Sequence, residues 1–183
     1  GTWGFGLWND PFSLSMGLGG AARRFPALPN AAWFFFASPP NYLSFRDDLP
    51  AQGFLAATFQ APAIPPTLLA LAAPGLGLAA LPGGAQLVRR VLRRLVKQSA
   101  VLVPADVTAW HDYILDWQAE AVTFEVDGQV IQATPVAPRG PLGLVIWIDN
   151  QYAALPPRGG LRFGTLANLK PGSLEVVDIN IQS

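Results

Sequence analysis

Short apolar runs closed by turn residues constrain the fold of this chain more than any other feature. The 183 residues include 18 glycines and 18 prolines, which divide most of the chain into runs of strand length. Several runs alternate large with small or polar residues, which is the two-residue period of a β-strand. Asp127-Gly128 stands between two such runs and predicts a tight hairpin. The pattern favours an all-β domain of the sandwich or jelly-roll class.

The aromatic run Trp33-Phe34-Phe35-Phe36 has large rings in both alternation phases, so it predicts a strand buried on both faces. Residues 13–30 are rich in glycine and proline and are expected to form a loop. The predicted strands cover residues 3–8, 31–37, 53–60, 111–117, 121–126, 129–134, 142–148, 161–166 and 174–181.

Residues 86–98 have the spacing of a helix, with an apolar stripe opposite four arginines and a lysine. A shorter helix is expected at 67–73, after Pro66. Residues 49–88 carry no charge, but prolines interrupt them, which argues against a membrane-spanning helix.

We interpret residues 61–100 as an insertion, helical over about 64–98. We expect its apolar stripe to pack on the sandwich, and contact of 86–98 with a membrane surface or a partner is the alternative.

Composition excludes several classes of function. Lysine plus arginine equals aspartate plus glutamate, so no net charge attracts nucleic acid. The chain has no cysteine, which removes disulfides and thiolate metal sites, and its one histidine, His111, excludes a multi-histidine metal site. An apolar fraction of 51% against 13% charged residues argues against disorder. We expect one domain over 1–183.

Two adjacent segments carry a family resemblance. The strand His111-x-Tyr113-x-x-Asp116-Trp117 and the hairpin Phe124-x-Val126-Asp127-Gly128 resemble a strand pair of the family 16 glycoside hydrolases, which belong to the concanavalin A-like superfamily. Residues 141–147 resemble the family's next inner strand, 174–181 its closing strand, and 4–8 the tryptophan-rich strand before the catalytic one.

The resemblance covers both ends of the chain but not residues 61–100. It implies a concanavalin A-like jelly-roll β-sandwich and favours an extracellular or cell-surface location. The chain begins directly in a predicted strand, so we expect a signal peptide to be absent or already removed, and we interpret this start as lacking one or two strands of the family fold.

The catalytic motif of the family has no counterpart at the expected position. In the family, the strand after the tryptophan-rich one carries a Glu-x-Asp-x-Glu or Glu-x-Asp-x-x-Glu motif, whereas the corresponding residues 31–36 here read Ala-Ala-Trp-Phe-Phe-Phe. Retaining hydrolysis needs two carboxylates about 5 Å apart. We therefore expect a non-catalytic binding protein, with carbohydrate as the first ligand class. A glycosidase that uses Asp10, Asp116 or Asp149 is an alternative.

Tryptophan rings stack on the apolar faces of sugars, and nearby Asn and Asp side chains bind their hydroxyls. The competing interpretation places the same rings in the core. A further alternative is an apolar or lipid-like ligand in a pocket capped by residues 61–100. No cofactor is required by this chemistry, although Asp178 is a candidate ligand of a structural calcium. The predicted ligand contacts are Trp8, Asn9, Trp33, Phe35, Trp147, Asp149, Asn150 and Tyr152.

Overall fold

β-Strands dominate the fold. The computed structural model describes residues 1–9, 27–65, 67–71, 81–167 and 171–182. Strands account for 40% of it and helices for 12%, and the strands named in it pair antiparallel. The prediction of an all-β class is confirmed.

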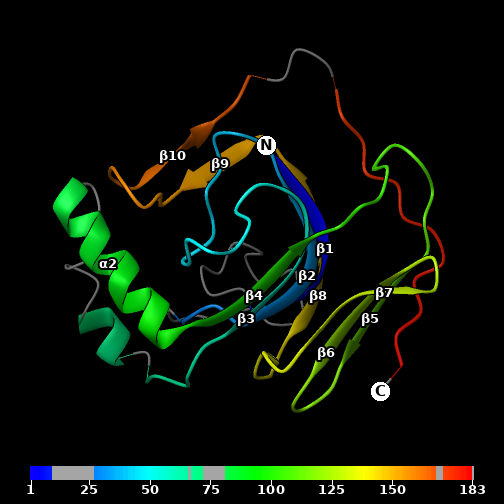
Figure 1. Cartoon of the computed structure of the whole chain (residues 1–183), viewed down its shortest axis with the longest axis horizontal. Helices are drawn as coiled ribbons and strands as arrows, with labels where there is room; N and C mark the ends of the chain where they lie inside the picture. The colour runs from blue at the N-terminus through cyan, green and yellow to red at the C-terminus, as the bar shows by residue number, and fades with distance from the viewer. Residues whose placement is uncertain (10–26, 66, 72–80, 168–170, 183) are drawn as a thin grey trace.

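The largest sheet has five strands in the order β4-β3-β2-β1-β8 (Figure 1). Its middle strands are apolar on both faces, as the aromatic run predicted, with Phe34 and Phe35 both buried. Strand β1 pairs with β2 on one side and with β8, far along the chain, on the other. The strands are β1 (Thr2–Trp8), β2 (Ala31–Ala37), β3 (Gly53–Gln60), β4 (Lys97–Leu102) and β8 (Gly143–Asp149).

A three-stranded sheet packs against one face of the large sheet. It contains β5 (Tyr113–Trp117), β6 (Val122–Val126) and β7 (Gln129–Thr134), and the predicted Asp127-Gly128 turn joins the last two. Phe34 of the large sheet meets Phe124 edge-on, with ring centroids 5.1 Å apart. Two sheets packed face to face around this aromatic core form a β-sandwich-like architecture.

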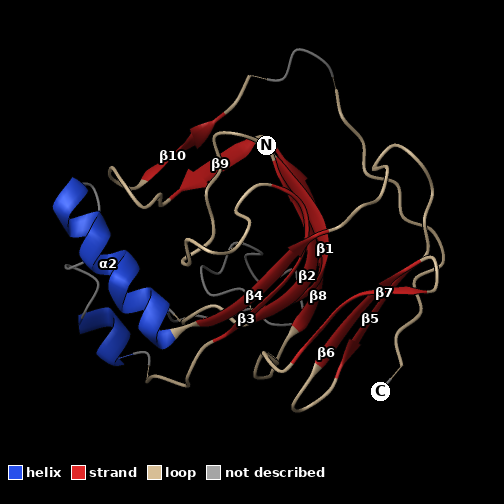
Figure 2. Ribbon diagram, viewed as in Figure 1, coloured by secondary structure: helices blue, strands red, loops and turns tan. Residues whose placement is uncertain are grey.

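The opposite, concave face of the large sheet is covered by a loop segment, a helix and a hairpin instead of a second sheet. Residues 41–51, which we call the cover segment, lie over it and contribute Leu43, Phe45 and Leu49 to a second apolar cluster. Helix α2 (Pro82–Leu95) and the hairpin of β9 (Gln151–Ala154) with β10 (Arg162–Thr165) lie on the same side (Figure 2). The three-stranded sheet lies on the other side.

The predicted helix 86–98 differs from α2 at both ends. The helix begins earlier, at Pro82, because a proline fits the first helical position, where its missing N–H costs nothing. It ends at Leu95 because Val96 has extended geometry and Lys97 and Gln98 pair with β3. The end of the predicted insertion 61–100 is therefore wrong, since residues 97–100 belong to the main sheet. Residues 67–71 are helical as expected, and 72–73 lie outside the described residues.

Two predictions near the C-terminus are wrong. The described residues 171–182 form no strand, although 174–181 alternate, because no backbone hydrogen bond joins them to another described segment. No strand was predicted between residues 148 and 161, but β8 extends to Asp149 and β9 follows it at once. Of the predicted loop 13–30, residues 13–26 lie outside the described part of the chain. No helix among the described residues has the length and apolar character to cross a membrane.

Candidate functional site: the concave aromatic face

Successive side chains of a strand point to opposite faces of the sheet, and on the concave face this places large rings and small residues side by side. Trp147, Gly4 and Phe35 lie in one row across β8, β1 and β2. The next row places Gly6 beside Trp33, so each large ring has a small neighbour on the adjacent strand. This arrangement lets the rings lie across the sheet and touch one another, where side chains of equal size would keep them apart.

The glycines of β1 are needed for this packing. A Cβ atom on Gly4 would stand 2.7 Å from the Trp147 ring, and one on Gly6 would stand 2.7 Å from the Cβ of Trp33. Gly6 also has φ +148°, a backbone conformation that side chains rarely adopt. The small residues in the alternating β1 sequence therefore have a specific role, which is to make room for two indole rings.

Trp8, Trp33 and Trp147 form a continuous cluster. The ring centroids of Trp33 lie 5.4 Å from those of Trp8 and 5.3 Å from those of Trp147, and Phe35 contacts both Trp33 and Trp147. Phe35 is buried, whereas the three tryptophans are half-buried and keep part of their surface accessible. The structure thus brings together four of the eight predicted ligand contacts.

Two indole N–H groups in this cluster lack a partner within the described residues. The Nε1 atoms of Trp8 and Trp33 are buried and make no hydrogen bond there. A buried indole N–H normally has an acceptor, because desolvating it unpaired costs free energy. Trp147 differs, since its N–H donates to Thr2 Oγ1 over 3.1 Å.

Asp149 is the one acidic residue on the strands of the large sheet. Its carboxylate accepts hydrogen bonds from Thr2 Oγ1 over 2.9 Å and from the backbone N–H of Gln151 over 3.0 Å. It lies in the row next to that of Trp147, opposite Thr2 on β1, and the Thr2 hydroxyl joins it to the Trp147 ring. A second carboxylate at the spacing of a retaining glycosidase is not found on the described strands of this sheet.

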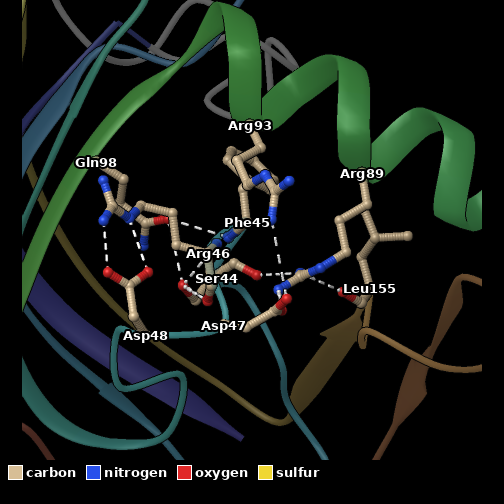
Figure 3. Close-up of polar contacts among 9 residues, drawn as sticks. All are labelled: Ser44, Phe45, Arg46, Asp47, Asp48, Arg89, Arg93, Gln98 and Leu155. Atoms are coloured by element: carbon tan, nitrogen blue, oxygen red, sulfur yellow. Dashed lines mark hydrogen bonds and ion pairs between the residues drawn. The ribbon is translucent and has the colours of Figure 1, made fainter.

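A buried arginine holds the cover segment in place (Figure 3). Arg89 of α2 is 6% exposed and donates to the backbone carbonyls of Ser44 and of Leu155, the latter over 2.8 Å. Its second terminal nitrogen donates to the Asp47 carboxylate over 2.6 Å, and its guanidinium lies 5.2 Å from the Tyr42 ring centroid. One planar group thus connects the helix, the cover segment and the chain after β9.

A second anchor comes from the edge of the sheet. The Gln98 side-chain carbonyl, on β4, accepts the backbone N–H of Phe45 over 3.0 Å and the Ser44 hydroxyl over 3.3 Å (Figure 3). Beneath this anchor, a cavity of about 20 Å³ remains between the sheet and the cover segment. Its wall is almost entirely apolar and includes Trp33, Phe35, Leu43 and Phe59. This volume is comparable to one water molecule.

Three predicted ligand residues lie outside the ring cluster. Asn9 is buried, and its side chain bonds the backbone of Leu28 and Asn30. Asn150 donates to the Leu166 carbonyl over 3.0 Å, and the Tyr152 ring lies against Gly164 on β10. Each of these side chains has a contact that supports the fold.

Asn9 also lines a larger hollow of about 390 Å³ at the end of β1. The hollow has apolar walls from Leu28 and residues 61–65, and Arg139 supplies a basic side chain. Its volume is in the range of small-molecule sites. It is separate from the ring cluster and is bounded by the residues that follow β3.

The remaining candidate carboxylates do not gather around the cluster. Asp10 lies outside the described residues, and Asp116 is on β5 in the other sheet, where it accepts from Gln118. Asp178 has φ +55° in the C-terminal segment. Within the ranges that the structure describes, no three acidic or histidine side chains group as a metal site. Calcium binding by Asp178 therefore stays a prediction.

Sequence reasoning missed the residues that cover the face. Arg89 lies on the charged side of the helix, opposite the apolar stripe that was expected to pack on the sandwich, and residues 41–51 have no periodicity that indicates a role. The run Asn41-Tyr42-Leu43-Ser44-Phe45, with apolar and polar residues mixed after two prolines, was the available signal. A buried arginine can be predicted only when the carbonyls that surround it are known.

Comparison with protein-family models, with curated proteins and with solved structures finds no match to this chain. The resemblance to the family 16 glycoside hydrolases therefore stays an expectation from the sequence. What can be argued about function comes from the geometry of the concave face.

Proposed function

We propose that this protein is a non-catalytic carbohydrate-binding module whose ligand lies on the concave aromatic face. The observation that carries the proposal is the contact cluster of Trp8, Trp33 and Trp147, which is half-buried on a rigid sheet. In this proposal the sheets are those of a concanavalin A-like jelly roll, with residues 61–96 as its insertion. The family resemblance supports that assignment through the strands at 111–128.

The chemistry of the cluster suits a sugar. Pyranose rings present C–H groups that pack on indole faces, and their hydroxyls need hydrogen-bond partners. The exposed carboxylate of Asp149, in the row next to that of Trp147, supplies an acceptor for these hydroxyls. A few polar groups placed among aromatic walls are typical of small-ligand sites.

The same face supports binding without hydrolysis. Asp149 has no second carboxylate beside it on the described strands, so the sheet offers no nucleophile and acid pair. The position where the family carries its acids holds Trp33 and Phe35, which neither attack an anomeric carbon nor transfer a proton.

Binding to laminarin and to agarose, measured by affinity electrophoresis and calorimetry, tests the proposal. Trp8→Ala is expected to weaken binding about tenfold or more, because truncating an aromatic anchor removes its contact area. Trp110→Ala is the matched control, since Trp110 is 67% exposed and outside the cluster. The proposal would be contradicted if the wild-type protein bound neither polysaccharide, or if the two variants lost the same amount of affinity.

An apolar ligand is the second candidate, and the cavity under the cover segment favours it. Its wall consists of rings and aliphatic side chains, with Leu43 and Pro50 contributed by the cover. A lipid-like chain would need the cover segment to move outward, because the present volume is about 20 Å³. This candidate would be favoured over carbohydrate if native mass spectrometry detected a co-purified lipid and the protein did not bind polysaccharides.

A further inference from the structure

Helix α2 packs on the rest of the protein through an unexpected side. Ala85, Arg89 and Val96 are buried, and Leu92 packs against the cluster under the cover segment. These positions follow one another at helical spacing, so they form a single stripe along the helix. The stripe that contacts the protein therefore includes a charged residue, although the helix has other apolar side chains to offer.

Those other apolar side chains point to solvent. Leu87, Val91 and Leu95 are 51%, 45% and 37% exposed. They recur every four residues, so they form one continuous aliphatic row on the outside of the helix. The residue just before the helix, Leu81, is also exposed. A helix that buries an arginine and exposes three aliphatic residues has a face with no partner among the described residues.

Positive charge borders this row. Arg90 follows Leu87 by three positions and Arg94 follows Val91 by three, which places each arginine beside the row. Both are exposed. No aspartate or glutamate occurs anywhere between Asp48 and Asp106, so nearby sequence supplies no acidic residue to offset them. The outer face of α2 is thus aliphatic and purely basic.

We propose that this outer face binds the surface of an anionic lipid membrane. The aliphatic row would enter the boundary between headgroups and acyl chains, and Arg90 and Arg94 would reach the lipid phosphates and carboxylates. Charge complementarity decides the occupant, because a row bordered only by arginine matches a surface that is uniformly negative. The helix would lie parallel to the membrane, held there by the Arg89 contacts on its inner side. The inference is independent of the ligand on the concave face.

Co-sedimentation with vesicles tests this proposal on the whole chain. One set of vesicles contains equal parts phosphatidylcholine and phosphatidylserine, and the other contains phosphatidylcholine alone. The wild-type protein should bind the first set, and the second much more weakly. Arg90→Gln with Arg94→Gln should lower the partition coefficient for anionic vesicles roughly thirtyfold. Leu87→Gln with Val91→Gln and Leu95→Gln should lower it at least tenfold on both sets.

A matched control removes exposed aliphatic side chains elsewhere. Ile114 and Val130, on the three-stranded sheet, are 52% and 59% exposed, and replacing both by glutamine should leave vesicle binding unchanged. Unchanged thermal unfolding of each variant shows that the fold is intact. No binding of the wild-type protein to anionic vesicles would overturn the proposal, as would equal binding to both sets. Sedimentation of a dimer that the Leu87, Val91 and Leu95 replacements abolish would assign the face to a second copy and overturn it as well.

Discussion

The charged contact at His111 links two loops beside the three-stranded sheet. His111 Nδ1 lies 2.7 Å from the Asp127 carboxylate, and its Nε2 lies 3.0 Å from the Asp106 carbonyl oxygen. Both neighbours are acceptors, so only the charged imidazolium, with two N–H groups, satisfies both. The hydrogen bond that His111 donates to the Asp127 carboxylate accordingly raises the pKa of His111 above 6.5 and lowers the pKa of Asp127 below 3.8.

These shifts predict a pH window for stability. The raised pKa of His111 means that its contribution is fully present below pH 6.5 and is lost as the pH rises through the higher value in the folded state. The lowered pKa of Asp127 means that its contribution is present above pH 3.8 and is lost as the pH falls through the lower value. The melting temperature of wild type minus that of His111→Gln should therefore be greatest between these limits and shrink in alkali. A difference that does not vary with pH would show that the pair is not charged.

Helix α2 and the cover segment depend on each other. The helix is fixed to the body by an arginine whose three acceptors come from outside the helix, and the cover segment has no regular structure of its own. The Arg89 contacts therefore hold each element against the other, while Gln98 separately holds the cover segment to β4. Their joint position determines how much of the tryptophan cluster a ligand can reach.

Removing the guanidinium should destabilise this unit. Arg89→Ala leaves the carbonyls of Ser44 and Leu155 without their donor, and each buried unsatisfied group costs about 1–3 kcal/mol. We expect the free energy of unfolding in urea to fall by about 3 kcal/mol, whereas Arg90→Ala, on the exposed side, should change it by less than about 0.5 kcal/mol. Arg89→Lys should not restore the loss, because an ammonium group lacks the planar fork. Equal stabilities of the Arg89 and Arg90 variants would contradict this account.

Elements were predictable from the sequence where periodicity and turn residues agree. Residues 31–37 and 53–60 are bounded by Pro and Gly, and both strands were predicted to the residue. The helix boundary at 95 was missed because Val96 continues the helical spacing while its backbone already extends toward β4. The strand at 174–181 was predicted wrongly. Alternation of apolar and polar residues indicates that a segment could have one buried and one exposed face, but it does not indicate that a neighbouring strand is there to pair with it.

The candidate site was predictable in part for a similar reason. Tryptophans signal a binding surface through their chemistry, and four of the predicted contacts meet on one face because strand alternation fixes their direction. Asn9 and Asn150 were predicted to bind sugar hydroxyls because they lie near the tryptophans, but their position after a strand also lets the amide bond the backbone of adjacent loops. Sequence alone does not distinguish these two uses of an asparagine.

At the scale of the whole molecule, the large sheet separates two apolar clusters. Phe34 belongs to the cluster shared with the three-stranded sheet, and it contacts rings from both sheets: Phe54 in the large sheet, and Tyr113 and Phe124 in the three-stranded one. Phe35, its neighbour, belongs to the cluster under the cover segment. One strand thus supports the structural core on one face and the proposed binding surface on the other.

This division predicts which core residue carries global stability. Phe34 is 1% exposed, so Phe34→Ala should lower the free energy of unfolding by about 3–5 kcal/mol through lost burial and the cavity left behind. Phe163→Ala provides the control, because that ring is 75% exposed on β10 and its loss should cost less than about 0.5 kcal/mol. Denaturant unfolding followed by circular dichroism measures both. A loss below about 1 kcal/mol for Phe34→Ala would place the stabilising core elsewhere.

The pairing of β1 with β8 has a consequence for synthesis in the cell. The hydrogen bond from Trp147 to Thr2 spans 145 residues, so β1 leaves the ribosome well before β8, the strand that pairs with its outer edge. At translation rates of about 5–20 residues per second, that delay is roughly 7–30 s. During this time the nascent chain holds an open, glycine-containing strand edge, which is the kind of edge that chaperones and other unfinished chains can engage.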